Sequence, residues 1–283
     1  MATGNVTTTT AAAFIPEIWL DAVQYALRES LEFRNVARIV TTDKGKGDKI
    51  HLPKINFSTA RDKSADTEIT FDTTTDTDTT ISLTSHKYSA IRVENIVEVQ
   101  AIVDQLQARA LQVAFPVAKA MDVSLAGLYS GISNAVDGAA LSSTTALGKL
   151  LTLKRTLDGL NAPRDGRVLV VEPYTESILM QVAQFTSRDY VAGPVSMTEG
   201  AVGRILGFDV IPSNNIQTDS GSYVNMAFVR NYSLGLAISQ DMRVRSWAEN
   251  KHFADALACD AIYGVGVLEA NSACKFTVTV PAE

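Results

Sequence analysis

Residues 95–129 read NIVEVQAIVDQLQARALQVAFPVAKAMDVSLAGLY and form the longest periodic run in the 283-residue chain. Its apolar residues recur every three or four positions, a spacing that places them on one side of a helix. They are Ile96, Val99, Val103, Leu106, Ala110, Val113, Val117, Met121, Leu125 and Leu128. At 1.5 Å per residue such a helix would be about 50 Å long. We therefore expect a spine helix that supports a flat or elongated body.

Two local signals describe this helix further. Asn95 is followed three residues later by Glu98, which forms a capping box that satisfies N–H groups of the first turn. Pro116 lies inside the run, where it removes one backbone hydrogen bond and costs roughly 3 kcal/mol unless the helix bends. The sequence predicts a helix that begins at Asn95 and is kinked, but not broken, at Pro116.

The composition is that of a soluble globular protein, with 46% hydrophobic and 20% charged residues. The length suggests about two domains and enough material for a core. A net charge of -6 and a pI near 5.2 argue against a surface that grips nucleic acid phosphates, so any DNA contact should be weak and local. No leader pattern and no membrane-spanning apolar run are evident, and we expect a soluble protein made in a cytoplasm.

No pattern of catalytic residues stands out. His51, His86 and His252 lack an H-E-x-x-H spacing, and there is no nucleophile elbow, P-loop or complete dinucleotide-binding glycine motif. Cys259 and Cys274 are far from a C-x-x-C spacing, so we expect two buried, reduced thiols. The sequence gives no reason to expect an enzyme, a metal or a cofactor.

Two weaker patterns have structural explanations. The spacing of Asp72, Asp76 and Asp78 is similar to that of a calcium loop, but the glycine turn and the terminal bidentate Glu are missing. A solvated acidic face is the preferred interpretation. The closely spaced Gly264 and Gly266 are best explained as a turn or a bulge.

Residues 1–40 are expected to form an N-terminal arm. Residues 1–13 are Thr, Ala and Gly without periodicity, which is typical of a tail. Phe14, Trp19 and the apolar residues after them then predict a short amphipathic helix following Pro16. Trp19 would pack either on the protein's own core or on a neighbouring subunit, and the residues leave both alternatives open.

Residues 41–93 predict an extended hairpin. GDKIHLPKINF has near-alternating apolar residues, and ISLTSHKYSAIRVE, residues 81–94, is predicted to be the returning strand. Between them, residues 58–80 are mostly Thr, Ser and acidic residues, with only Ile69 and Phe71 to bury. Because an isolated hairpin is marginally stable in water, we expect it to lie on another surface.

The rest of the chain predicts a compact α/β part and returning strands. The spine helix and the loop after it occupy residues 94–145. Strand and helix patterns alternate through residues 146–240, with a buried strand in RVLVVEP and another in GAVGRILGFDVIPSNNI. Strand signals in residues 241–283 are expected to return to the spine helix.

This order of parts resembles the major capsid proteins of tailed double-stranded DNA phages, which have the Hong Kong 97-like fold. In that family the parts are called the N-arm, E-loop, peripheral domain and axial domain. Four runs also look like coat proteins of this superfamily: FIPEIW at Phe14–Trp19, GDKIHLPKI at Gly47–Ile55, GRILGFDVIPSNN at Gly203–Asn215 and AIYGVGVLEA at Ala261–Ala270. The resemblance covers nearly the whole chain and implies an α+β fold, with the spine helix in the peripheral domain and a compact α/β axial domain.

The resemblance also implies what the protein does. It implies an icosahedral shell of hexamers and pentamers, assembled around a separate scaffolding protein and a portal, able to carry a decoration protein, and later filled with DNA. The extended hairpin would then lie across the adjacent subunit. The intersubunit contacts expected on this basis are Phe14, Trp19, Arg61, Asp62, Lys63, Asp66 and Phe71.

Some family features do not transfer, and other functions stay open. Certain members join subunits by a Lys–Asn isopeptide bond, but no motif pairs Lys54 or Lys63 with Asn271, so no crosslink is expected. No long charged helical segment precedes the arm, which favours scaffolding by a separate chain. The alternatives are an encapsulin-type compartment, or an oligomeric α/β enzyme or ligand-binding protein with its site near Glu172 or Asn214.

Overall fold

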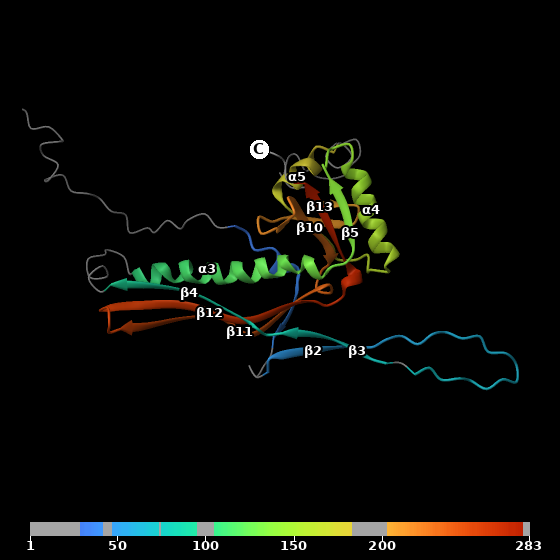
Figure 1. Ribbon diagram of the computed structural model, residues 1–283, viewed down its shortest axis with the longest axis horizontal. Coiled ribbons are helices and arrows are strands. Elements are labelled where there is room, and N and C mark those ends of the chain that lie inside the picture. The colour runs from blue at the N-terminus through green and yellow to red at the C-terminus, as the bar shows by residue number, and fades with distance from the viewer. Residues whose placement is uncertain (1–28, 42–46, 74, 95–104, 183–202, 280–283) are drawn as a thin grey trace, which may run out of the picture.

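The computed structural model describes residues 29–41, 47–73, 75–94, 105–182 and 203–279. The helices in these ranges are α1 (Phe33–Val36), α3 (Gln105–Ala126), α4 (Ala146–Gly159) and α5 (Pro173–Met180), with 3-10 turns η2 (Gly127–Gly131) and η3 (Ala270–Ser272). The strands are β1 (Arg38–Thr41), β2 (Lys49–Lys54), β3 (Thr77–Ser82), β4 (Ser85–Glu94), β5 (Ala135–Ala139), β6 (Arg167–Val171), β7 (Arg204–Ile205), β8 (Phe208–Pro212), β9 (Thr218–Asp219), β10 (Ser222–Val229), β11 (Leu234–Glu249), β12 (Ala254–Val267) and β13 (Ala273–Thr279). Figure 1 shows an elongated molecule with α3 along its length.

The helix α3 is the predicted spine. The members of its apolar stripe that are almost completely buried are Val113, Val117, Met121 and Leu125. Pro116 lies on the exposed side of the helix, and the helix continues through it. The predicted start and capping box at Asn95 lie outside the described residues, and the bend at Pro116 stays a prediction.

The spine helix is apolar because it covers a sheet. The order of strands in this four-stranded spine sheet is β1-β11-β12-β4, and α3 packs against β4, β11 and β12. Residues Arg109–Gly131 are long and apolar enough to cross a membrane by length and composition. Their buried side chains share one core cluster with Leu257, Cys259 and Tyr263 of β12, which is the environment of a core helix.

A second, seven-stranded sheet forms the compact α/β part above one end of the spine (Figure 1). The order of its main path is β5-β13-β10-β6-β8-β7, and β6 and β8 are parallel, as the predicted strand–helix–strand alternation requires. The helices α4 and α5 bury Leu150, Leu153 and Leu179 in the same core cluster as residues of this sheet. The α+β fold with a spine helix and a compact α/β part is thus confirmed.

The last strand differs from the prediction. β13 was expected to return to the spine helix, but it pairs with β10 and β5 in the seven-stranded sheet. Its alternate residues Cys274, Phe276 and Val278 are fully buried in the core cluster that contains α4. Alternating buried residues fit either sheet, so the pattern of this strand did not reveal its partner.

The returning strand of the extended hairpin also differs. Residues 81–94 were predicted to pair as one strand, but β3 pairs with β2 and β4 pairs with β12. The hairpin ladder therefore begins at Lys49↔Ser82 and ends at Lys54↔Thr77. Residues 55–76, which we call the finger, extend beyond it without a strand (Figure 1). β4 joins the spine sheet because this buries Val93 and packs Ile91 against the main core.

Both cysteines are buried and free, as the sequence predicted. Burial raises the pKa of the Cys259 thiol and raises the pKa of the Cys274 thiol to about 11. A thiol with such a raised pKa is a poor nucleophile at neutral pH. The two residues therefore behave as small hydrophobic core side chains.

Candidate intersubunit surface

The finger is held in shape by its own polar contacts. Arg61 forms an ion pair with Asp72, and its Nη1 donates a hydrogen bond of 2.9 Å to Thr70 Oγ1. The backbone N–H of Thr59 donates to Asp72 Oδ2 at 3.0 Å. These bonds join the two legs of the finger, although no strand ladder does.

The apolar side chains of the finger are exposed. Phe57 is 99% exposed, Phe71 90%, Ile55 76% and Ile69 66%. Burying one such side chain completely stabilises a complex by about 1.5–3 kcal/mol before the costs of association. Four large apolar residues on one projecting segment therefore make it a candidate surface for contact with another protein.

The residues predicted as intersubunit contacts lie as follows. Phe14 and Trp19 lie outside the described residues. Lys63 donates to the Ser64 carbonyl at 3.5 Å, and Asp66 has a φ of 61° at the tip of the finger. Asp62 is exposed beside them. The structure thus brings the finger residues together on one projection, and their contact with another subunit stays a prediction.

The sequence interpretation missed two residues of this surface, Ile55 and Phe57. Both directly follow β2, and we counted them with the strand rather than with the segment beyond it. The signal was present, because the polar Thr, Ser and Asp residues of the opposite leg offer them no apolar partner.

The base of the hairpin is seated on the spine sheet by a close approach of two backbones. Ile81 of β3 is 1% exposed and lies over Gly235, Gly264 and Gly266 of β11 and β12. A Cβ at Gly264 would lie 2.2 Å from the Ser82 carbonyl oxygen, and one at Gly266 would lie 3.0 Å from Ile81 Cγ1. Gly264 and Gly266 were predicted to form a turn or a bulge. They lie inside β12, where the missing side chains admit the hairpin.

Polar contacts complete this seat. Lys54, the last residue of β2, forms an ion pair with Glu269, and the hydrogen bond to that carboxylate raises the pKa of Lys54. Thr79 Oγ1 donates to the Leu268 carbonyl at 3.5 Å. Apolar packing at Ile81 and these two contacts together set the direction in which the finger leaves the body.

Substituting Gly264 by Ala should displace the base of the hairpin from the spine sheet. The new methyl group cannot occupy its site without moving the backbone of β3, and overpacking of this kind costs about 1–3 kcal/mol. We expect a lower midpoint of urea unfolding and faster proteolysis at the hairpin. Gly148→Ala is the matched control, because a Cβ at Gly148 on α4 meets nothing within 4 Å. A Gly264→Ala protein as stable and as protease-resistant as the control would contradict the role of this seat.

A buried carboxylate joins the spine to two other parts of the chain. Asp122 of α3 is fully buried; its Oδ1 accepts from the Arg34 backbone N–H at 3.0 Å, and its Oδ2 accepts from Asn215 Nδ2 at 2.8 Å. Arg34 lies in α1 and Asn215 follows β8, so one side chain links the base of the arm, the spine and the α/β part. Desolvation by burial raises the pKa of Asp122. The sequence contained a signal for this junction, because Asp122 is a charged residue beside the apolar stripe of the helix, but the sequence analysis did not identify it.

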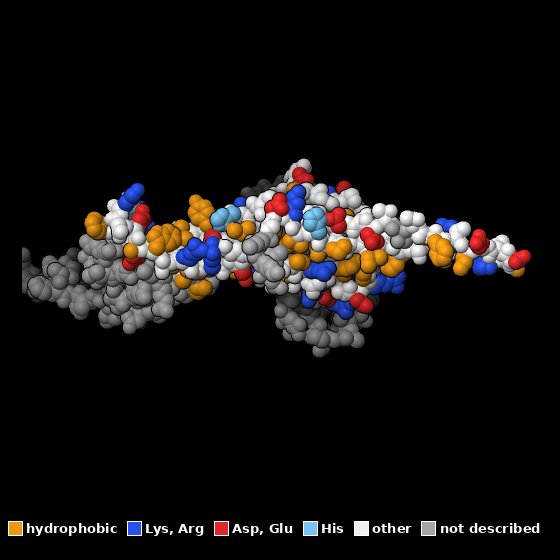
Figure 2. Space-filling view, turned by 90° about the horizontal axis from the view of Figure 1, so that it is seen from below, with side chains coloured by type: hydrophobic (Ala, Val, Ile, Leu, Met, Phe, Trp, Pro, Cys, Tyr) orange, Lys and Arg blue, Asp and Glu red, His pale blue; other side chains and the backbone are white. Residues whose placement is uncertain are grey.

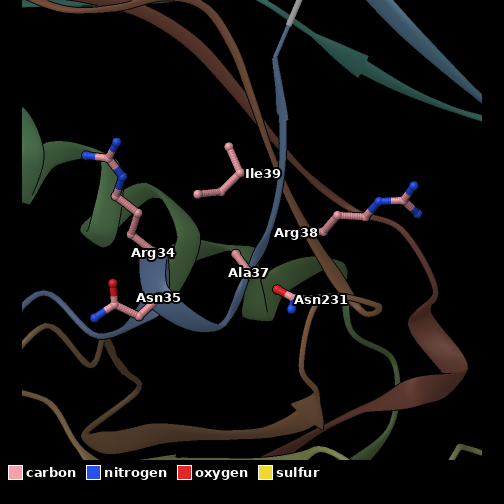
Figure 3. A pocket seen from close by; sticks show the side chains of 6 residues that line it. All are labelled: Arg34, Asn35, Ala37, Arg38, Ile39 and Asn231. Carbon is pink, nitrogen blue, oxygen red and sulfur yellow. The ribbon is translucent and has the colours of Figure 1, made fainter.

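The depression beside β1 does not have the arrangement of a ligand site. It measures about 500 Å³ and is lined by residues that include Arg34, Arg38 and Ile39. Figure 3 shows the side chains of the two arginines pointing in opposite directions, with Ala37 and Ile39 between them. Since binding sites converge their polar groups on the ligand, this depression gives no support to an enzyme or a ligand-binding protein.

The other candidate sites have structural roles in the described residues. Glu172, proposed near an enzyme site, caps α5 by accepting from the Tyr174 N–H at 2.7 Å. Asp72, which is part of the calcium-like spacing, forms an ion pair with Arg61. Within the described ranges no three His, Cys, Asp or Glu side chains are grouped so that they could hold a metal ion.

An elongated subunit whose projecting finger exposes large apolar side chains is suited to a structural protein that assembles with other subunits. The comparison with known proteins agrees. Residues 37–280 match a family described as phage capsid protein, and the chain belongs to that family. It is a phage capsid protein, and its place in the virion is the capsid.

Solved structures show the same fold. A structure from Mycobacterium phage Che8 is 23% identical with a TM-score of 0.78, and covers 93% of this chain and 97% of that chain. The capsid of cyanophage P-SCSP1u is 16% identical with a TM-score of 0.82, over 99% and 97% of the two chains. The mature capsid of bacteriophage PhiM1 is 13% identical with a TM-score of 0.75, over 94% and 93%. No curated protein sequence matches this chain. The resemblance to the Hong Kong 97-like fold is confirmed.

Proposed function

We propose that this protein is the major capsid protein of a tailed double-stranded DNA phage, and that it assembles as hexamers and pentamers. The observation that carries the proposal is the finger, whose four exposed apolar side chains have no partner surface on their own subunit in the described residues. Contacts of this kind, repeated by symmetry, add many modest interfaces into one stable container.

The parts of the chain have distinct roles in this proposal. Residues 1–40 are the arm that reaches a neighbouring subunit, and residues 41–93 are the E-loop, whose finger lies across the adjacent subunit. Most of residues 94–145 and 241–283 supply the peripheral domain with the spine sheet, and residues 146–240 supply the axial domain, whose seven-stranded sheet β5 and β13 also join. The seat at Gly264 supports this assignment, because it fixes the finger as a projection and leaves its apolar residues free.

The partners follow from the same role. A separate scaffolding protein and a portal would guide assembly in the host cytoplasm, and a decoration protein could be added later. The packaged DNA would be contacted weakly, since a net charge of -6 does not favour binding to phosphates. The role is structural, and no catalytic activity is part of the proposal.

Electron microscopy of the purified protein, expressed with and without its scaffolding protein, tests this function. Closed shells several hundred Å across, built of hexamers and pentamers, are the expected result. Small discrete oligomers under both conditions would overturn the proposal.

A further inference from the structure

Within the described ranges, the spine and its sheet are joined to the α/β part by three short crossings of the chain. The first crossing is residues 132–134, between η2 and β5. The second is residues 230–233, between β10 and β11, and the third is residues 268–272, between β12 and β13. Because the crossings are so short, a rotation of the α/β part relative to the spine sheet must be taken up in these few residues.

The second and third crossings are bonded to each other through two buried serines. Ser233 and Ser272 are both almost completely buried, and their hydroxyl oxygens lie 2.7 Å apart. The Val229 N–H donates to Ser233 Oγ at 2.9 Å, and the Leu268 N–H donates to the Ser233 carbonyl at 2.8 Å. Since a buried donor or acceptor left without its partner is costly, the two crossings move together.

The first crossing is bonded to the third as well. Asn134 Nδ2 donates to the carbonyls of Ala270 and Ala273, at 3.1 Å in each case. The Asn134 carbonyl accepts from the Lys275 N–H at 2.8 Å. The third crossing therefore receives bonds from both of the other crossings.

The base of the extended hairpin is attached to the same crossing from the other side. Glu269 holds Lys54, and the Leu268 carbonyl accepts from Thr79 Oγ1. The Leu268 side chain also lies beside Ile81, because a Cβ at Gly235 would be 2.9 Å from Leu268 Cδ2 and 3.0 Å from Ile81 Cδ1. Figure 1 shows the third crossing, between β12 and β13, with the hairpin below it and the α/β part above, and Figure 2 shows the finger leaving the body as one projection.

We infer that the third crossing couples the direction of the finger to the orientation of the α/β part, so that neither can turn against the spine sheet without moving the other. Turning the α/β part breaks the buried bonds at Ser233 unless Leu268 and Glu269 move with it. These two residues carry the contacts that hold Ile81 and Lys54 of the hairpin. A coupling free energy of this kind is reciprocal, so a change on either side is felt on the other.

The coupling is a property of the single subunit. Its consequence for a shell rests on the proposed function: the direction in which each finger leaves its subunit follows the way in which the α/β part of that subunit is held by its neighbours. The two parts of the molecule that project furthest from the spine sheet therefore adjust together.

Hydrogen exchange of the unassembled, full-length protein tests the coupling from the α/β side. Ser272→Ala is expected to speed exchange at residues 49–54 and 77–82 of the hairpin by at least about threefold, although Ser272 touches neither strand. Thr175→Val is the matched control, because it removes a buried hydroxyl whose partner, Asn225, lies inside the α/β part. Equal exchange of the hairpin in the two variants would overturn the inference.

A second variant on the same side leaves the buried serines in place. Asn134→Ala removes only the amide bonds from the first crossing to the third. The same faster exchange of the hairpin is expected, and hairpin exchange as slow as in the unsubstituted protein would contradict the inference.

The reverse measurement starts from the hairpin. Lys54→Gln is expected to speed exchange at residues 268–275, whereas Lys49→Gln, at the opposite end of β2, should not. In the double variant Lys54→Gln/Ser272→Ala the hairpin is already loosened from the third crossing, so Ser272→Ala should affect hairpin exchange less than it does alone. Effects that simply multiply would show independent contacts and overturn the inference. Because these measurements use the unassembled subunit, such a result leaves the proposed function intact, and failure to form shells leaves the coupling intact.

Discussion

Replacing residues 55–76 with an Asn-Gly dipeptide is expected to abolish shell formation and to leave the subunit folded. The dipeptide closes β2 and β3 with a two-residue turn, which preserves the pair Lys54↔Thr77. The Ile81 seat and the Lys54–Glu269 ion pair remain. The free energy of unfolding should change by no more than about 0.5 kcal/mol, as for changes at exposed sites.

The subunit should stay folded because the removed residues make no contact that the body needs, and assembly should fail because the exposed apolar residues proposed as the interface are gone. The finger's polar bonds connect its own legs, and its apolar side chains face solvent. Urea unfolding measures the stability, and electron microscopy measures assembly. A variant with Phe57→Ser and Phe71→Ser keeps the length of the finger and should also fail to assemble. An unfolded truncated protein would show that the finger belongs to the core, and normal shells would show that it is not an interface.

Substituting Asp122 by Ala should have the largest effect on the stability of the subunit itself. The change leaves the buried Arg34 N–H and Asn215 Nδ2 without acceptors, and each unsatisfied buried donor costs about 1–3 kcal/mol. We expect a loss of about 3 kcal/mol in the free energy of unfolding, together with increased proteolysis near Arg34, where the arm leaves the spine. Urea unfolding and limited proteolysis measure the two effects.

Asp122→Asn is the matched control. The side-chain oxygen of the new Asn can accept the hydrogen bond from the Arg34 N–H. Asn215 Oδ1 is buried and has no partner in the wild-type structure. If the Asn215 side-chain amide turns over, the new Asn amide can donate to this oxygen. We expect this variant to retain most of the stability. If Asp122→Ala were as stable as Asp122→Asn, the junction would not join the arm, the spine and the α/β part as the geometry indicates.

The pH dependence gives a second measure of the same residue. Because burial raises the folded-state pKa of Asp122 above the ordinary 3.8, the folded protein takes up the proton more readily than the unfolded chain. The cost of burying the charge is fully present above the folded pKa. It disappears as pH falls through that pKa toward 3.8. The wild-type protein should therefore gain stability relative to Asp122→Asn as the pH is lowered from 7, and a constant difference would contradict this.

The sequence by itself determined the parts that depend on local pattern. The three- and four-residue spacing around Val113 and Met121 required a helix with one buried face, and the structure confirms it. The polar composition of residues 58–76 left Phe71 with nothing nearby to pack on, so an exposed projection could be predicted. Together with the order of parts, these features were sufficient to indicate the capsid fold.

Tertiary structure decided what depends on pairing between distant segments. β4 pairs with β12 and β13 with β10 because those partners bury their side chains, and no strand carries the identity of its partner in its own sequence. Gly264 is required only because the backbone of Ser82 comes within contact distance of it. Asp122 acts as a junction only because Arg34 and Asn215 both donate hydrogen bonds to it. Local periodicity fixes which face of an element is buried, whereas the packing of remote elements decides what is buried against it.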